Sequence, residues 1–169
     1  MLWLVLRFWK PVAAWLKKMS LGQQILASFL SSLVLIAFSL IPFFWLKIIN
    51  WQLPQAWAEF AKAAVSLNAA FTTAGMLFGL LAGLAWFNTK GGFDAKGSFW
   101  KRILRYILGM AGVLVLYLGL KVLFGLIAPS TEAVLPYILR YIRYVLVGAW
   151  ISAGAPWIFV KLNLAKRAA

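Results

Sequence analysis

The chain contains no cysteine and no histidine, and only three of its 169 residues are acidic. The lack of cysteine excludes disulfides, thiolate metal sites and iron–sulfur clusters, and the lack of histidine removes the commonest general base and metal ligand. Glu59, Asp94 and Glu132 are far apart and lie outside the long apolar runs, so they predict neither a paired-carboxylate site nor a proton relay. We therefore expect no metal site, no cofactor, no catalytic residue and no enzymatic activity.

Apolar residues are in large excess, at 64% of the chain, where soluble domains have about 45–50%. Lysine and arginine number 17 against the three acids, which gives a net charge of +14. These cations flank long apolar runs and do not gather on one polar face, so the pattern predicts a membrane protein and excludes nucleic acid as a partner.

Four apolar runs are long enough to cross a bilayer core, which is about 30 Å thick and needs about 20 helical residues. They cover residues 25–46, 63–87, 106–127 and 141–160, and together they predict an all-α integral membrane protein with a four-helix transmembrane domain over 21–169, packed as a bundle. Twelve of the 17 cations lie before the first run, between the second and third, or after the fourth. Cytoplasmic loops carry the excess of lysine and arginine, so both termini are predicted to face the cytoplasm.

Residues 1–20 combine cations with Trp3, Phe8, Trp9 and Trp15, and no small-residue cleavage pattern follows them. This pattern predicts an amphipathic helix that lies in the membrane interface, with its rings at headgroup depth. A second short amphipathic stretch, over 51–59, is expected on the opposite membrane surface. Both stretches are also compatible with simple anchoring at the interface.

Three glycines in the second run, Gly75, Gly79 and Gly83, are spaced by four and therefore share one helical face. A face without side chains lets another backbone approach closely. The spacing predicts either packing against a neighbouring helix of the same chain or docking of another subunit, a rigid lipid or a pigment.

Basic and aromatic residues alternate at the start of the fourth run, where Arg140, Arg143 and Tyr144 are close in sequence to Tyr137 and Tyr141. Arginine suits phosphate through its fork of donors, and Lys121, expected at the same depth, is a further candidate ligand for a lipid phosphate. The alternative is that these residues are snorkelling interface anchors. At the other membrane surface Lys101, Arg102 and Arg105 are candidates for contact with anionic lipid, although topology alone also explains them.

Several segments of the last hundred residues carry a family resemblance: AGMLFG at 74–79, Trp86, GGF at 91–93, KRILRY at 101–106, RYIRY at 140–144 and APWIF at 155–159. This pattern resembles the C-terminal membrane extension of bacterial PAP2-type (type-2 phosphatidic acid phosphatase) lipid phosphatases. The family's catalytic motifs depend on histidine, which this chain lacks, and residues 129–132 match the Pro-Ser-Gly-His motif only in their first two letters. The resemblance therefore implies a non-catalytic membrane portion, located in the bacterial inner membrane.

Two functions are compatible with these features. The first is an accessory or structural subunit of a larger membrane complex, held to other membrane protein subunits through the glycine face. The second is a protein that binds or transports an anionic lipid, such as a polyprenyl phosphate, through its arginines. Membrane lipids are expected partners in either case.

Overall fold

The computed structural model describes residues 3, 7, 11–12, 14–16, 18–49, 66–127 and 134–167. Within these residues the fold is helical apart from one isolated antiparallel bridge between Asp94 and Lys166. The predicted interfacial helix over 1–20 falls only in part on described residues, and the stretch over 51–59 lies outside them, so both stay predictions.

Four long apolar segments confirm the predicted all-α architecture, and each is long enough to cross a membrane. They are α2 (Leu21–Ile48), α4 (Asn68–Thr89), α5 (Phe99–Ile127) and a fourth segment, Leu135–Lys161. The fourth segment consists of α6 (Leu135–Ala149), one π-helical stretch, η2 (Trp150–Gly154), and α7 (Ala155–Lys161). The helix α5 starts well before the predicted residue 106, because its backbone stays helical through the charged turn that an apolar count leaves out.

The start of α2 shows how the local sequence sets a helix boundary. Ser20 accepts a hydrogen bond from the Gln23 backbone N–H at 3.3 Å, and the Gln23 side chain accepts one from the Ser20 backbone N–H at 2.9 Å. This capping box satisfies two donors that would otherwise have no helical partner. The helix therefore begins at Leu21, four residues before the apolar run was expected to start.

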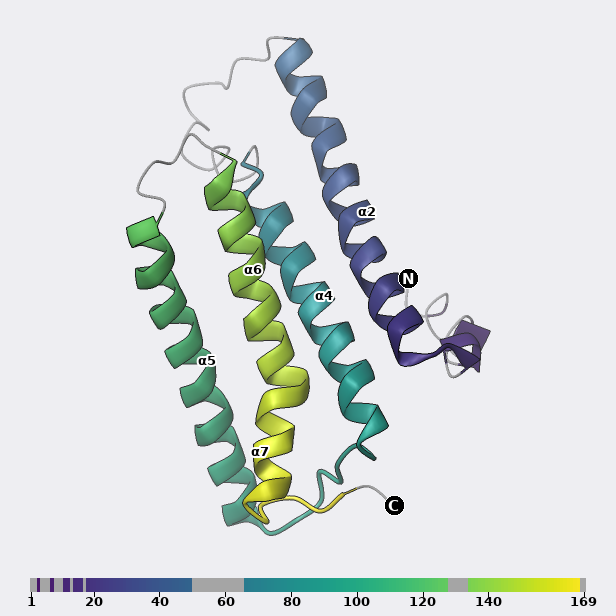
Figure 1. Ribbon diagram of the computed structural model, residues 1–169, viewed down its shortest axis with the longest axis vertical. Helices are drawn as coiled ribbons and strands as arrows, with labels where there is room; N and C mark the ends of the chain where they lie inside the picture. Colours follow the sequence, from purple (N-terminus) through teal and green to yellow (C-terminus); the bar gives the residue numbers. More distant parts are fainter. Residues whose placement is uncertain are drawn as a thin grey trace.

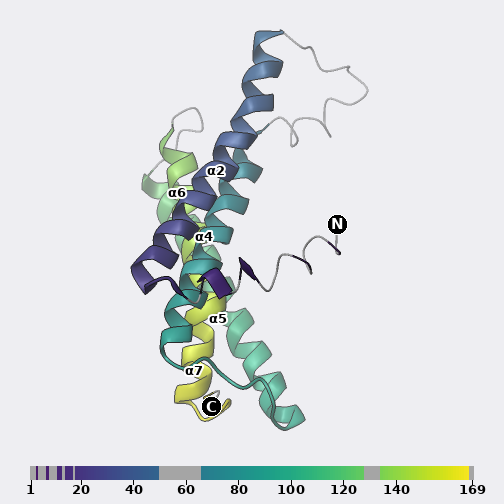
Figure 2. The same cartoon turned by 90° about the vertical axis from the view of Figure 1, so that its right-hand side faces the viewer.

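The helices form a row and not a closed bundle, which differs from the predicted packing (Figure 1). α4 packs between α2 and α6. The segment from α6 to α7 packs between α4 and α5, so α2 and α5 are the two edges of the row. Turned by 90°, the helices overlap and lean in different directions (Figure 2). The edge helices are poorly covered: the only buried residue of α5 is Arg105, and those of α2 are Ser28 and Ser32.

The glycine face of α4 explains why α4 and α6 form the centre of the row. A Cβ added at Gly75 would lie 2.5 Å from the carbonyl oxygen of Tyr141, and one added at Gly79 would overlap the carbonyl oxygen of Val145. From the other side, a Cβ at Gly148 would lie 2.8 Å from the carbonyl oxygen of Met76. Only glycine allows two helix backbones to approach this closely.

A polar contact connects α2 to the centre of the row. The hydroxyl groups of Ser32 and Tyr141 are 2.7 Å apart, and Ser32 is fully buried. The Tyr141 ring also stacks on Phe78 of α4, with ring centroids 6.5 Å apart. Tyr141 therefore contacts both neighbouring helices on that side.

Replacing Ser32 with Ala tests this contact. Interhelical hydrogen bonds in membrane proteins average about 0.6 kcal/mol, so the variant is expected to lose about that much stability. Thermal unfolding in detergent, measured for Ser32→Ala, Tyr141→Phe and the double variant, gives the coupling between the two hydroxyls. Strictly additive losses would show that the two hydroxyls do not interact.

Candidate anion-binding site

Three cations meet between the end of α5 and the beginning of α6. Lys121 lies six residues before the end of α5, and Arg140 and Arg143 lie five and eight residues after the start of α6. At 1.5 Å per residue, all three are about 8–12 Å from the ends of their helices and so at a similar depth. They line a cavity of about 150 Å³ together with Phe124, Gly125, Pro136 and Leu139.

Arg143 is the most deeply placed of the three. Only 9% of its surface is exposed, and its Nε has no hydrogen-bond partner among the described residues. The guanidinium carbon lies 5.0 Å from the ring centroid of Tyr117 and 5.4 Å from that of Tyr144. These two rings, one from each helix, are themselves 6.1 Å apart and nearly edge to face. Arg143 is therefore fixed by cation–π contacts while at least one of its donors is left over.

The described residues supply no counter-charge for this cavity. Neither Lys121 nor Arg140 forms a hydrogen bond or an ion pair with another described residue. Asp94 is the one acid within the described ranges. It precedes α5, so it lies beyond the helix end that is opposite to the cavity. A buried cation is costly unless it is paired, so the buried Arg143, with the half-buried Arg140 and the exposed Lys121 beside it, favours a bound anion.

Sequence reasoning found the three cations and Tyr144 but missed Tyr117, Phe124 and Gly125. The spacing carried a signal for them: Tyr117, Lys121, Phe124 and Gly125 follow the four- and three-residue steps that place side chains on one helical face. Tyr137 and Tyr141, by contrast, belong to the packing of α6 against α4, where the Tyr137 ring lies 5.2 Å from that of Phe71.

The predicted glycine face is not available to a partner. Gly75, Gly79 and Gly83 are buried, and the face is covered by α6 and η2 of the same chain. Of the two interpretations of this motif, the structure places the glycines in packing within the chain. The partner-docking interpretation is wrong for this face because no space is left on it.

The three cations at the start of α5, predicted to contact anionic lipid, differ in their exposure to solvent. Lys101 donates to the carbonyl oxygen of Asn163 at 3.0 Å and Arg102 to that of Gly97 at 3.1 Å, and both remain exposed. Arg105 was expected on the membrane surface, but it is only 7% exposed and donates to the carbonyl oxygen of Ala95 at 2.9 Å. Arg105 therefore holds the loop before α5 in place. The prediction that it contacts lipid at the membrane surface is wrong for this residue, because its side chain is buried.

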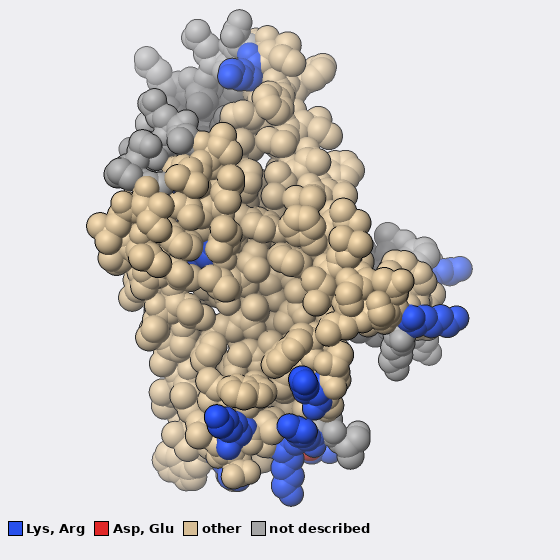
Figure 3. Space-filling model, viewed as in Figure 1, with Lys and Arg blue, Asp and Glu red and all other residues tan. Residues whose placement is uncertain are grey.

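Lysines and arginines gather at this end, which we call the basic end (Figure 3). It comprises the end of α4, the start of α5 and the end of α7, with these exposed cations: Lys90, Lys96, Lys101, Arg102, Lys161, Lys166 and Arg167. Over the upper parts of α5 and α6 in the same view, the blue surface is a small area surrounded by uncharged residues. The cations of the basic end are exposed, whereas at the cavity Arg143 is buried, Arg140 is half-buried and Lys121 is exposed.

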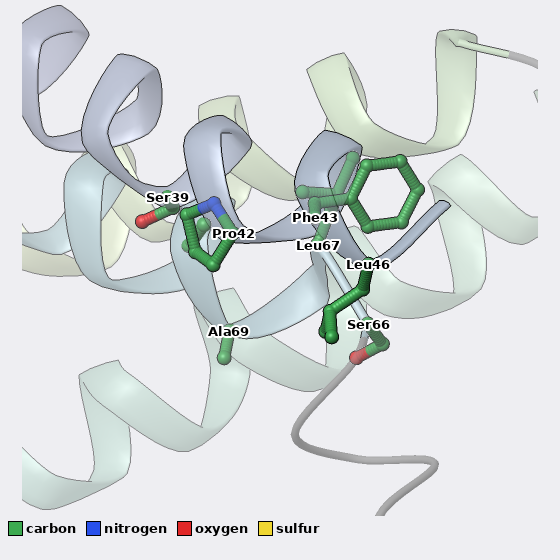
Figure 4. A pocket seen from close by; sticks show the side chains of 8 residues that line it. Ser39, Pro42, Phe43, Leu46, Ser66, Leu67 and Ala69 are labelled. Carbon is green, nitrogen blue, oxygen red and sulfur yellow. The ribbon is translucent and has the colours of Figure 1, made fainter. Parts of the chain in front are cut away.

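A second cavity, of about 230 Å³, lies between α2 and the start of α4 (Figure 4). Its lining is uncharged and includes Ser39, Pro42, Phe43 and Leu67. The Ser39 hydroxyl donates to the carbonyl oxygen of Leu35 at 2.9 Å within its own helix. This cavity therefore lacks the charge that distinguishes the site between α5 and α6.

Four long apolar helices define the chain as an all-helical, multi-pass membrane protein. The sequence model of the PAP2 superfamily phosphatase transmembrane extension matches residues 71–167, and the chain belongs to this family. The match confirms the resemblance predicted from the sequence. It covers all but the first three residues of α4 and continues through α7, includes every residue that lines the cavity between α5 and α6, and leaves α2 outside. Searches of curated proteins and of solved structures returned no match.

Proposed function

We propose that this protein is a non-catalytic membrane protein that binds the phosphate group of an anionic lipid in the cavity between α5 and α6. The proposal rests on one observation: Arg143 is buried with an unpartnered Nε in a cavity that Lys121 and Arg140 also line. A phosphate group offers the several acceptor oxygens and the negative charge that such a cluster lacks.

The orientation follows from the distribution of charge. By the positive-inside rule the basic end, which includes the end of α7, faces the cytoplasm. The cavity then lies in the outer half of the bilayer, at a depth that the headgroup of an outer-leaflet lipid reaches. A polyprenyl phosphate fits this description, since its charge is confined to a small headgroup. The membrane concerned is the bacterial inner membrane.

The family assignment supports a second role as an accessory subunit. The matching family is a transmembrane extension of phosphatases, while this chain has no histidine with which to form that family's catalytic motifs. In this role the chain presents a phosphorylated lipid to a separate catalytic chain. Native mass spectrometry of gently extracted protein reports bound proteins and lipids together, so one spectrum tests both roles.

Replacing Arg140 and Arg143 with Gln tests the lipid site. Native mass spectrometry of wild-type protein is expected to show a bound phosphate-bearing lipid, and the double variant is expected to lose it because two of three cations are removed. The matched control replaces Lys96 and Arg167 with Gln, which removes two exposed cations from the basic end and is expected to leave lipid binding unchanged. Equal retention of the lipid by both double variants would contradict the proposal.

A further inference from the structure

Towards the basic end, α5 packs tightly against the segment that runs from α6 to α7. The Trp150 indole Nε1 donates to the carbonyl oxygen of Gly109 at 3.1 Å, and a Cβ added at Gly112 would overlap the Trp150 ring. A Cβ at Gly109 would lie 3.5 Å from the ring of Phe159. Gly109 and Gly112 thus let α5 pack directly on the neighbouring segment.

Towards the end of α5 the two helices separate. The rings of Tyr117 and Tyr144 bridge them at 6.1 Å between centroids, and beyond these rings a Cβ added at Gly125 would meet no atom within 4 Å. Gly125 nevertheless lines the cavity with residues of α6, so it lies at the edge of the cavity beside open space. Figure 1 shows α5 and α6 diverging in this direction. The result is a wedge that is closed at Trp150 and open at Gly125.

The lining of the wedge is amphipathic. Lys121, Arg140 and Arg143 supply the charge, and Phe124, Pro136 and Leu139 supply apolar surface in the same cavity. A free phosphate ion would match the first group alone, whereas a lipid matches both. The cavity is small, at about 150 Å³, so it suits a headgroup whose hydrocarbon chain lies outside it.

We infer that a phosphate-bearing lipid reaches the three cations sideways, from the bilayer, through the open end of the wedge, and that the first part of its chain lies against Gly125. This inference rests on the proposed function, because it takes the same three cations as the phosphate ligands. It adds that the gap at Gly125 is the path by which the lipid enters. The neighbouring surface is suited to the rest of the chain, since Leu126 is 77% and Ile138 47% exposed.

Replacing Gly125 with Leu tests the path. The new side chain has room, so the fold is expected to keep its thermal unfolding midpoint in detergent, while the gap is filled. Binding is measured with two probes: dioleoyl phosphatidic acid in mixed micelles, and water-soluble pyrophosphate. The variant is expected to bind phosphatidic acid at least about tenfold more weakly, which corresponds to about 1.4 kcal/mol, and to bind pyrophosphate as the wild type does.

The control is Gly119→Leu, because Gly119 also has no neighbour within 4 Å of an added Cβ but does not line the cavity. It is expected to bind both probes like the wild type. If Gly125→Leu binds phosphatidic acid normally, or loses both probes equally, sideways access past Gly125 is wrong. If Gly125→Leu fails to fold, Gly125→Val is measured in the same way. The Arg140→Gln, Arg143→Gln double variant keeps the tests separate, because it is expected to lose both probes, and a normal affinity there would overturn the proposed function itself.

Discussion

Replacing Gly79 with Leu is expected to prevent the protein from folding or to lower its stability in detergent by at least about 3 kcal/mol, the upper end of the usual cost of overpacking. The reason is geometric. Even the first carbon of the new side chain would overlap the backbone carbonyl of Val145. A backbone atom within α6 cannot move aside as the end of a flexible side chain can. Thermal unfolding followed by size-exclusion chromatography measures the effect.

Gly119→Leu serves as the control, since it adds the same side chain to a membrane-spanning helix at a position with open space. It is expected to unfold at the wild-type temperature. Gly75→Ala is a milder test of the same interface, because its single added carbon would lie 2.5 Å from the Tyr141 carbonyl oxygen. An unchanged midpoint for Gly79→Leu would mean that α4 and α6 do not pack as described.

The glycine motif thus has to be interpreted as packing within the chain and not as a docking face for a partner. From the sequence, substitutions at Gly79 and Gly83 would have tested whether a partner is released. In the structure, Gly83 faces Ala149 and Ser152 of the same chain, and Ser152 also donates to the carbonyl oxygen of Gly79 at 3.3 Å. Loss of a partner from such a variant would therefore follow from misfolding and would not identify a docking face.

The helices could be predicted from the sequence because a bilayer imposes a length and a composition that can be counted. Each of the four runs coincides with a long apolar helix. The boundaries were less predictable, since backbone hydrogen bonding continues through cations such as Lys101 and Arg102, while an apolar count ends at them. The capping box at Ser20 shows that the boundary signal lay in side chains outside the apolar run.

The site could be predicted only in part. Arg140 and Arg143 are close in sequence, and their pairing with Lys121 followed from their similar depth. The position of Tyr117 beneath Arg143 depends on how α5 rotates against α6, and this rotation is set by the fit of Trp150 against Gly109 and Gly112. The order of helices in the row is likewise a property of such contacts, and hydropathy carries no information about it.

Replacing Arg143 with Met distinguishes a binding role from a structural one. In lipid-free detergent the variant is expected to unfold within about 1 kcal/mol of the wild type, because two large terms oppose each other. An arginine in a membrane helix costs up to about 2.5–3.5 kcal/mol on insertion scales, the value that applies at the centre of the bilayer. A desolvated cation–π contact returns up to about 2 kcal/mol, and Arg143 makes two, to Tyr117 and Tyr144.

The two proteins are expected to differ once a ligand is added. A ligand that binds only the folded state stabilises it by about 2.7 kcal/mol at a concentration one hundred times its Kd. The wild type is expected to gain stability of this order from phosphatidic acid, and Arg143→Met is expected to gain much less, because the buried donor is gone. Thermal unfolding across a series of lipid concentrations measures both responses.

A structural role makes the opposite prediction. If Arg143 serves only to hold Tyr117 and Tyr144 together, its removal lowers stability in lipid-free detergent and leaves the response to phosphatidic acid intact. Arg143→Lys separates the contributions further, because lysine keeps the charge and the attraction to the rings but lacks the planar fork of donors. A stabilisation by lipid that follows the order Arg, Lys, Met would assign the buried guanidinium to the phosphate. An equal stabilisation of all three would assign it to the packing between α5 and α6.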